Sequence, residues 1–305
     1  MESSAVSYGA ATVVAAFASG KGGAVSTQLK TFANVNLTKG KKIEAEIIGG
    51  PKEDTTLLKA CVKRTLDFYG FNFGCRIETE SDIPIARGLK SSSAAANAAC
   101  LAVAGALCKE HGHVEQTRLG KSPPENVYFI GKKRVDALDV VKLGVAAAFD
   151  AKVTVTGAFD DAAASMLGGF VLTDNAKNVI VRRGEMEELP VIIHVPKMRS
   201  YSGKVDLSRL MLLKREVDFA WEEARKGGVY TALTLNGILT ANALNLSTEP
   251  IFQALDAGAI AAGISGKGPS TVAISRKPED VVAAWSKLPG KIIVTKLNNK
   301  KAEIL

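Results

Sequence analysis

The chain has 305 residues, a formal net charge of +8, and contents of 47% hydrophobic and 23% charged residues, which is typical of a globular protein of one or two domains. Two tryptophans, five tyrosines and eleven phenylalanines, with basic residues spread along the chain, argue against a stacking surface for single-stranded nucleic acid. Three histidines leave little material for a histidine metal site or a Ser-His-Asp triad.

The four cysteines, Cys61, Cys75, Cys100 and Cys108, have no metal-ligand spacing, and three lie in apolar segments. They read as reduced thiols of a cytosolic protein. No cationic region precedes an apolar run at the N-terminus, and no stretch of about 18 uncharged apolar residues is convincing as a membrane span. We therefore expect a cytoplasmic protein that binds neither membrane nor nucleic acid.

Hydrophobic periodicity predicts the first secondary-structure elements. These are strands within residues 5–18, 27–38, 42–48 and 75–80, and a helix at 57–68. Between the first two strands, residues 19–23 read as a flexible loop with one cation, Lys21, between glycines. Lys21 either belongs to a surface turn or reaches a ligand.

Residues 84–97 combine a glycine turn, two cations and three hydroxyls with the start of an alanine-rich helix, expected from residue 94 to residue 108. Ser91, Ser92 and Ser93 then fall at the cap and first turn, where free backbone N–H groups and the positive end of the helix dipole point outward. This pattern is typical of an anion site, and phosphate is the usual anion. A Ser-capped core helix is the alternative interpretation.

The segment 111–133 is polar and reads as a connection with a short helix, followed by a helix at 135–149 that ends at Asp150. A second candidate site follows, where Gly157 precedes the adjacent carboxylates Asp160 and Asp161 and a Gly-Gly pair comes after them. The alternative there is a loop with a helix N-cap at Asp160.

The C-terminal part alternates strands and helices around a third glycine-rich stretch, residues 257–270. Strands are expected at 170–173, 179–182, 191–196, 271–275 and 291–295, and helices at 207–226, 230–245, 251–255 and 278–288. The mixture predicts an α+β protein of two layered domains.

The three glycine-rich stretches match neither the P-loop nor the dinucleotide fingerprint. Their order is specific, however. Pro-x-x-x-Gly-Leu-x-Ser-Ser at residues 84–92 resembles the phosphate loop of the GHMP kinases, usually Pro-x-x-x-Gly-Leu-Gly-Ser-Ser-Ala. Ser-Gly-Lys-Gly-Pro-Ser at 265–270 resembles the third motif of that superfamily, and Asp161, seven residues before Gly168, is similar to its catalytic aspartate.

Within the superfamily, the archaeal shikimate kinases are the most similar family. Their pattern is matched at residues 18–22, 153–162, 235–239 and 254–260. Homoserine kinases share the third motif but carry His-Pro-Asp-Asn where this chain has Ala-Phe-Asp-Asp. Homoserine kinase, or another GHMP small-molecule kinase, remains the alternative.

The resemblance implies a two-domain GHMP kinase fold. An N-terminal domain, residues 1–165, would hold a ribosomal-protein-like βαβ unit, and residues 166–305 would form a ferredoxin-like domain, with ATP and substrate in the cleft between them. It also implies ATP-dependent, Mg²⁺-dependent phosphorylation of the 3-hydroxyl of shikimate, a step in aromatic amino acid biosynthesis. A homodimer is one expected assembly.

The resemblance also assigns site residues. The residues expected to bind ATP are Pro84, Ile85, Ala86, Arg87, Gly88, Leu89, Lys90, Ser91, Ser92, Ser93, Ala94, Gly266 and Gly268. Ser92 and Asp150 would hold Mg²⁺. Asp161 would accept or orient the proton of the acceptor hydroxyl, with Asp160 as its rival.

Lys21 would activate Asp161 or hold the shikimate carboxylate, and Ser19, Thr156 and Asp160 would contact the substrate. Arg87, Lys90 and Arg199 are weaker candidates for anion contacts. Lys90 departs from the family pattern because glycine is usual at its position. The N-terminal motif of the superfamily is not recognisable, so no lysine is assigned from it.

The basic charge raises one alternative of a different class, an RNA-binding protein built on the ribosomal-protein-like domain. It predicts steeply salt-dependent RNA affinity and no ATP-linked turnover. Acidic residues in the cleft argue against it, because they would repel RNA phosphates.

Overall fold

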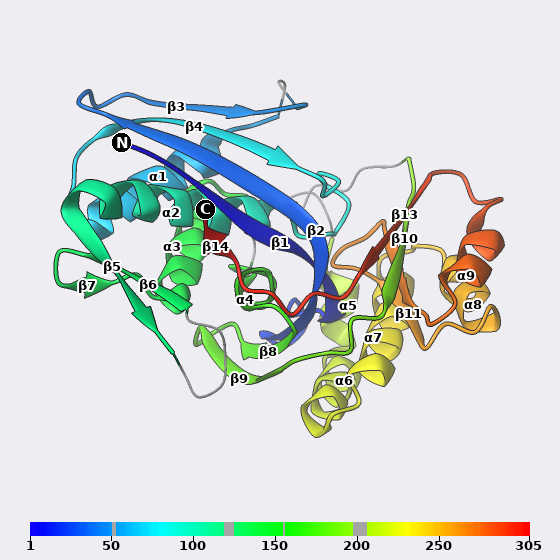
Figure 1. The fold of residues 1–305 in the computed structure, drawn as a ribbon. Helices are drawn as coiled ribbons and strands as arrows, with labels where there is room; N and C mark the ends of the chain where they lie inside the picture. The colour runs from blue at the N-terminus through cyan, green and yellow to red at the C-terminus, as the bar shows by residue number, and fades with distance from the viewer. Residues whose placement is uncertain (51–52, 119–124, 155, 198–205) are drawn as a thin grey trace.

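The computed structural model describes residues 1–50, 53–118, 125–154, 156–197 and 206–305. Figure 1 shows an N-terminal part built on long strands, with a smaller layered part beside it that contains most of the chain after residue 190. The strands that form the large sheet are β1 (Glu2–Val14), β2 (Lys21–Thr38), β3 (Ile43–Ile47), β4 (Gly74–Ser81), β8 (Phe170–Asp174), β9 (Val179–Gly184) and β14 (Glu303–Ile304).

The large sheet runs in the order β14-β1-β2-β4-β3, and β8 and β9 extend it from β2. β3 and β4 pair in parallel, and α1 (Thr56–Tyr69) connects them, which gives the expected βαβ unit. A crossover helix is the usual way to join parallel neighbours. Residue 165, the expected domain boundary, lies within α4 (Phe159–Leu167), and β8 after it still pairs with β2. The division into domains stays a prediction.

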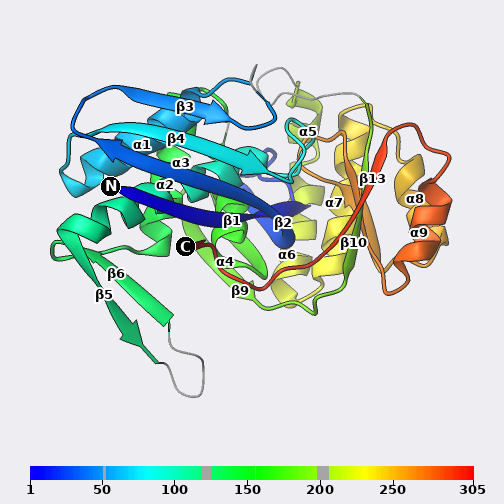
Figure 2. The ribbon, with the colours of Figure 1, turned by 45° about the horizontal axis from the view of Figure 1, so that its top comes forward.

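Helix α2 (Ser91–His111) lies against the large sheet and packs between β1, β2 and the helices α1 and α3 (Ala137–Asp150). From Ala96 to Cys108 every residue of the helix is buried, as a helix without a polar face requires. In length and composition α2 could cross a membrane, but 78% of its apolar window is buried inside the protein. It is therefore the core helix of this sheet, and its N-terminus points toward the C-terminal part (Figure 2).

The C-terminal part contains an antiparallel sheet in the order β11-β12-β10-β13. Its strands are β10 (Pro190–Val195), β11 (Ala261–Ile264), β12 (Thr271–Ile274) and β13 (Lys291–Lys296), and its helices are α5 (Ser208–Leu212), α6 (Lys214–Lys226), α7 (Val229–Ala243), α8 (Glu249–Asp256) and α9 (Pro278–Trp285). The chain order is βαββαβ, the ferredoxin-like arrangement that the sequence predicted.

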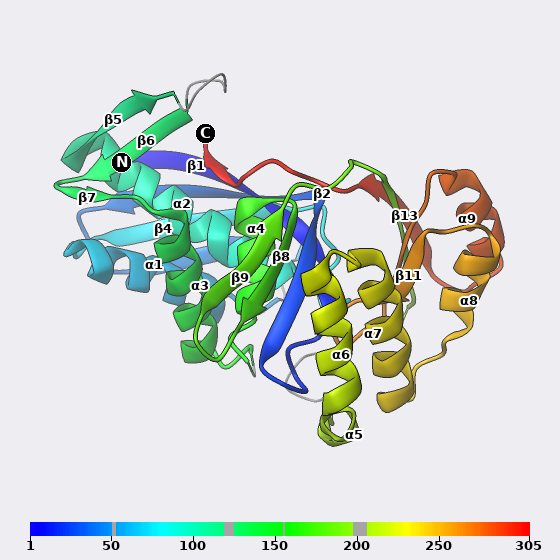
Figure 3. The ribbon, with the colours of Figure 1, turned by 90° about the horizontal axis from the view of Figure 1, so that it is seen from below.

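Alternation along β10 places helices on both faces of this sheet. Val191 and Ile193 pack in one cluster with α6 and α7, whereas Ile192 packs in another with α8 and α9. Successive strand residues point to opposite faces of the sheet, so the unbroken apolar run of β10 is buried on both faces. Figure 3 shows the two helix pairs on either side of the strands.

The polar segment after α2 differs from the prediction. Where it is described, it forms strands rather than the expected short helix: β5 (Gly112–Thr117) pairs with β6 (Glu125–Ile130), followed by β7 (Lys133–Arg134). All residues of β5 are exposed. A strand with no buried face lacks the alternation from which strands are read, which explains the error.

Candidate active site

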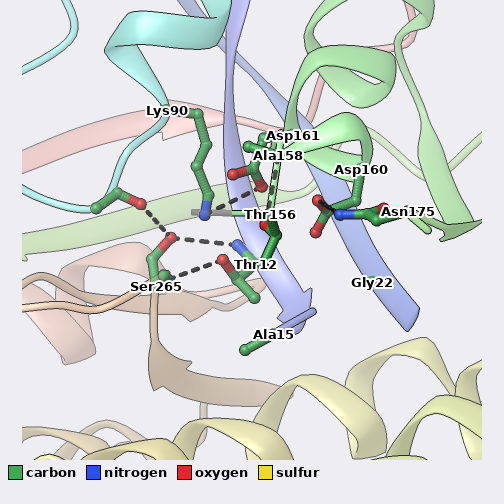
Figure 4. A network of polar contacts seen from close by, with 12 residues as sticks. Thr12, Ala15, Gly22, Lys90, Thr156, Ala158, Asp160, Asp161, Asn175 and Ser265 are labelled. Carbon is green, nitrogen blue, oxygen red and sulfur yellow. Dashed lines mark hydrogen bonds and ion pairs between the residues drawn. The ribbon is translucent and has the colours of Figure 1, made fainter. Parts of the chain in front are cut away.

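One cavity joins the three glycine-rich stretches of the sequence. The residues that line it are Thr12, Ala15, Ala16, Phe17, Ala86, Gly88, Lys90, Ser91, Ser92, Ser93, Ala96, Gly144, Val145, Ala148, Val153, Thr154, Thr156, Gly157, Ala158, Asp160, Asp161, Ala162, Gly266, Lys267 and Gly268. They come from the end of β1 and the residues after it, the loop before α2 and its start, α3, the segment between α3 and α4, the start of α4, and the loop before β12. Figure 4 shows the polar contacts that connect these segments.

The first wall of the cavity, as we call residues 86–90, is the loop that leads into α2. Ala86, Gly88 and Lys90 all have left-handed backbone, with φ of 56°, 80° and 66°. For Ala86 and Lys90 this conformation is unfavourable by about 1–2 kcal/mol each, strain that typically accumulates at functional sites. The turn brings the three serines of the first helical turn to the cavity, where backbone N–H groups and the helix dipole favour an anion.

The loop around Ser265 is bonded directly to this first wall. Ser265 Oγ donates to the Gly88 carbonyl at 2.7 Å and accepts from Thr12 N–H at 3.2 Å, while Gly266 N–H donates to Thr12 Oγ1 at 2.8 Å. Gly88 has to be glycine here, because a Cβ on it would lie 2.2 Å from the Ser265 carbonyl oxygen. The third motif and β1 therefore hold the loop before α2 in one position (Figure 4).

Lys90 extends from this loop toward α4. Its Nζ lies 3.0 Å from Asp161 Oδ1, and its side chain is 8% exposed. The left-handed backbone explains why glycine suits this position, and the buried ion pair gives the lysine a contact that glycine could not make. Lys90 thus joins the start of α2 to the start of α4.

Asp160 and Asp161 open α4 after Ala158, whose φ is 51°. Consecutive helical residues project about 100° apart, so the two carboxylates face different surroundings. Asp161 faces Lys90, whereas Asp160 Oδ1 accepts from Asn175 Nδ2 at 2.8 Å and packs against Gly22, where a Cβ would lie 2.5 Å from its Oδ2. Asp161 is therefore the carboxylate beside the cation, and Asp160 is held against β2.

The pKa of Asp161 is raised to about 7, chiefly because burial disfavours the charged form and further because Asp160 is near, while Lys90 and Lys267 act in the opposite direction. A carboxylate that titrates near neutral pH can both accept and release a proton. This is the property expected of a general base in such a cavity.

Lys267 is the charged residue of the cavity lining to which the sequence analysis assigned no role. It stands between Gly266 and Gly268 in the third motif, is 7% exposed, and its Nζ lies 4.5 Å from the centre of the Phe17 ring. The available signal was a cation between two glycines, the same signal that selected Lys21. Sequence could not tell which of the two lysines lines the cavity.

The structure does not bring Lys21 to the cavity. β2 already begins at Lys21, and strand alternation turns Gly22 toward Asp160 and Lys21 to the other face. There Lys21 Nζ lies 3.7 Å from Asp218 Oδ1 and 5.0 Å from the centre of the Trp221 ring. Ser19, which also hydrogen-bonds Asp218, does not line the cavity either.

Asp150 also lies outside the cavity lining. It is the last residue of α3 and accepts two hydrogen bonds from Arg64 of α1, at 2.6 Å from Nε and 2.7 Å from Nη2. Hydrogen bonding to Arg64, against a smaller effect of burial, lowers the pKa of Asp150. In this position the carboxylate connects two helices rather than facing the loop before α2.

The resemblance assigned Mg²⁺ to Asp150, but because its side chain is not at the cavity, we expect Asp150→Asn to leave the response of the steady-state rate to Mg²⁺ unchanged. Its melting temperature should fall slightly, since the amide loses the charge of the Arg64 pair. A Mg²⁺ titration of the steady-state rate, beside Arg64→Gln as the matched change, checks this. A raised Mg²⁺ requirement in Asp150→Asn but not in Arg64→Gln would contradict it.

The other predicted residues divide into those that line the cavity and those that support it. Thr156 lines it and accepts from Ala158 N–H at 3.4 Å. Arg87 donates to the Lys197 carbonyl at 2.8 Å, and Arg199 lies outside the described residues. The predicted ATP-site residues that do not line the cavity are Pro84, Ile85, Arg87, Leu89 and Ala94.

Two solved structures share this architecture over nearly the whole chain. A mevalonate kinase superposes with a TM-score of 0.69 at 17% identity, covering 97% of this chain and 99% of that one. A homoserine kinase from Cytophaga hutchinsonii superposes with a TM-score of 0.69 at 19% identity, covering 99% and 97%. At these identities the likeness shows the fold, which is the GHMP kinase fold that the sequence predicted.

Sequence comparison shows the family as well as the fold. A family model described as "GHMP kinases N terminal domain" matches residues 56–122. A protein named shikimate kinase from Methanothrix thermoacetophila is 42% identical over 306 residues, covering 100% of this chain and 96% of its own length. The shikimate kinase of Methanocella arvoryzae is 40% identical over 309 residues, covering 100% and 97%. The chain belongs to the shikimate kinase family of the GHMP kinases.

Proposed function

We propose that this protein transfers the γ-phosphoryl group of ATP to the 3-hydroxyl of shikimate. One observation carries the chemistry: the buried carboxylate Asp161, with its pKa raised to about 7, shares a cavity with the N-terminus of α2 and with Lys90. The choice of acceptor is supported by the 42% identity to a shikimate kinase over the whole chain.

The nucleotide phosphates would be held by the start of α2. The backbone N–H groups of Ser91, Ser92 and Ser93 are in the first turn, where intrahelical acceptors are lacking. Phosphoryl transfer depends mostly on positioning and on neutralising charge, so a rigid cradle with a positive dipole supplies much of what it requires. The bond from Ser265 to Gly88 keeps that cradle fixed.

Asp161 would take the proton of the attacking hydroxyl. The acceptor oxygen forms a bond to the γ-phosphorus, the bond from that phosphorus to the bridging oxygen of ADP breaks, and the hydroxyl proton passes to Asp161. Lys90, 3.0 Å from Asp161, holds the carboxylate in place and favours its charged form. Asp160 and Thr156, which also line the cavity, are proposed to contact the acceptor.

A magnesium ion in this cavity would have few ligands from the protein. Among the described residues there is no group of three or more histidines, cysteines and carboxylates that could hold a metal ion. The Ser92 hydroxyl lines the cavity at the phosphate cradle, and Mg²⁺ bound to a nucleotide characteristically takes most ligands from phosphate and water. Ser92 is thus the proposed protein ligand, and the ion would neutralise charge on the phosphates.

A panel of acceptors tests the proposed function. Purified protein should release ADP from ATP with shikimate and give no comparable rate with homoserine, mevalonate or galactose. Phosphorus NMR of the product should show the new ester at the 3-position. A higher rate with homoserine would assign the alternative kinase activity.

We also propose that the protein is located in the cytoplasm. A homodimer stays a prediction.

The pH dependence tests the role of Asp161 and Lys90. The active form of Asp161 is the carboxylate, so kcat/KM should fall as the pH drops through about 7, the raised pKa of this group. Lys90→Met removes a cation that lowers this pKa, so the acidic limb should move to higher pH. Lys59→Met, an exposed change on α1, is the matched control. An acidic limb that stays in place in Lys90→Met would contradict the assignment.

A further inference from the structure

The backbone around Lys267, which lines the cavity, is held in one conformation. The turn around it depends on left-handed glycines on both sides, with φ of 61° at Gly266 and 71° at Gly268. The same turn is anchored by the bonds of Ser265 to Gly88 and of Gly266 to Thr12. The backbone that carries Lys267 is therefore fixed to the loop that would hold the nucleotide phosphates.

The ammonium group of Lys267 is directed into the protein rather than to solvent. Its Nζ lies 4.5 Å from the centre of the Phe17 ring, which lines the same cavity just beyond β1. The face of an aromatic ring attracts a cation, so Phe17 favours the charged form of Lys267 at this place in the cavity. Burial of the side chain, with the nearby charge of Lys90, lowers the pKa of Lys267 to about 8, while Asp161 acts in the opposite direction.

Lys267 also lies close to Asp161, the proposed base, and to Lys90, which holds that carboxylate. Its charge interacts with both Lys90 and Asp161. A Cβ on the neighbouring Gly266 would lie 3.0 Å from Lys90 Nζ, and that Nζ is 3.0 Å from Asp161 Oδ1. The turn that carries Lys267 therefore lies beside the ion pair of Lys90 and Asp161, in the cavity that also receives the start of α2.

We propose that Lys267 is a catalytic residue that donates hydrogen bonds to the transferred phosphoryl group, alongside Lys90. This rests on the proposed kinase function. Charge spreads over the three equatorial oxygens of the phosphoryl group during transfer, and two ammonium groups beside it stabilise that charge. Lys267 keeps its proton throughout, the acceptor proton passes to Asp161, and ADP leaves with the electrons of the broken P–O bond.

The kinetic test compares Lys267→Met and Lys267→Arg with Lys287→Met, an exposed lysine change in the same half of the chain. Lys267→Met should lower kcat by about 100-fold, the scale seen when one donor to a transition state is removed. The KM for the acceptor should stay within about threefold, because the contact is to the phosphoryl group. Lys267→Arg should restore part of kcat. Unchanged kcat with a raised acceptor KM would overturn the proposal and make Lys267 a binder of the acceptor carboxylate.

Measuring nucleotide binding in the absence of an acceptor tests the role of Lys267 independently of which acceptor the enzyme uses. In titration calorimetry, Lys267→Met should bind the β,γ-imido analogue of ATP about tenfold more weakly, from loss of one charged contact, and bind ADP as the unchanged protein does. Equal effects on the analogue and on ADP would overturn the proposal. Because no acceptor is present, the result stands even if the acceptor panel fails to give shikimate.

Discussion

Asp161→Asn should remain folded and lose turnover by a factor of at least about 100, since removing a general base typically costs about 10²–10⁴-fold. Asparagine has the same shape, and its amide oxygen can still accept from Lys90 Nζ, which lies 3.0 Å from Oδ1 in the structure. The amide cannot take the hydroxyl proton, so the loss should appear in kcat. Steady-state kinetics and a thermal melt of the same preparation measure both properties.

Two other aspartates make this test specific. Asp67→Asn, on the exposed side of α1, is a control for the substitution itself. Asp160→Asn tests the rival carboxylate, whose bond to Asn175 and contact with Gly22 hold it toward β2. Near-normal turnover in Asp161→Asn, or a loss confined to Asp160→Asn, would remove Asp161 from the proposed chemistry.

Gly88→Ala is expected to weaken ATP binding by at least about tenfold. Gly88 has φ of 80°, where a non-glycine residue is unfavourable by about 1–2 kcal/mol. The added Cβ would also lie 2.2 Å from the Ser265 carbonyl oxygen and 3.2 Å from that of Gly268. Both neighbours are backbone atoms and cannot rotate away, so the two loops have to separate and the phosphate cradle opens.

Gly258→Ala separates the effect of backbone strain from the effect of the contact between an added Cβ and Ser265. Gly258 has φ of 81°, almost equal to that of Gly88, and a Cβ there would meet nothing within 4 Å. It should therefore show the backbone strain alone, as a lower melting temperature with unchanged ATP affinity. Calorimetric titration of ATP into both variants decides the matter. Equal affinities in Gly88→Ala and Gly258→Ala would mean that the contact with Ser265 does not shape the nucleotide site.

Much of the architecture was predictable because its signals are local. Glycines at fixed offsets, the serines before an alanine-rich run and the adjacent aspartates are all visible in the chain, and their order identifies the family. The structure brings these stretches to one cavity, as expected from that order. Their chemical roles stay proposals.

Which residues reach the cavity depends on the direction of each side chain rather than on residue type, and a local sequence pattern does not give that direction. Residues 19–23 read as a loop, but β2 starts at Lys21, and a strand fixes which side each residue faces. Asp150 is the last residue of α3, and its side chain faces Arg64 of α1, whereas Gly144, Val145 and Ala148 of the same helix line the cavity. Lys90 and Lys267 gain their importance from each other and from Asp161, which are 71 or more positions away in the chain, so no local pattern could reveal them.

The bond between Ser265 and Gly88 joins residues 177 positions apart. Contacts of such long range form late, because the chain entropy of closing a large loop has to be overcome before they contribute. The proposed phosphate cradle is therefore complete only when both halves of the chain have folded, and partly folded chains should not bind ATP. Nucleotide then stabilises the native state selectively, by about 2.7 kcal/mol at a concentration of 100 times Kd, which would protect this enzyme from unfolding in proportion to the cellular supply of ATP.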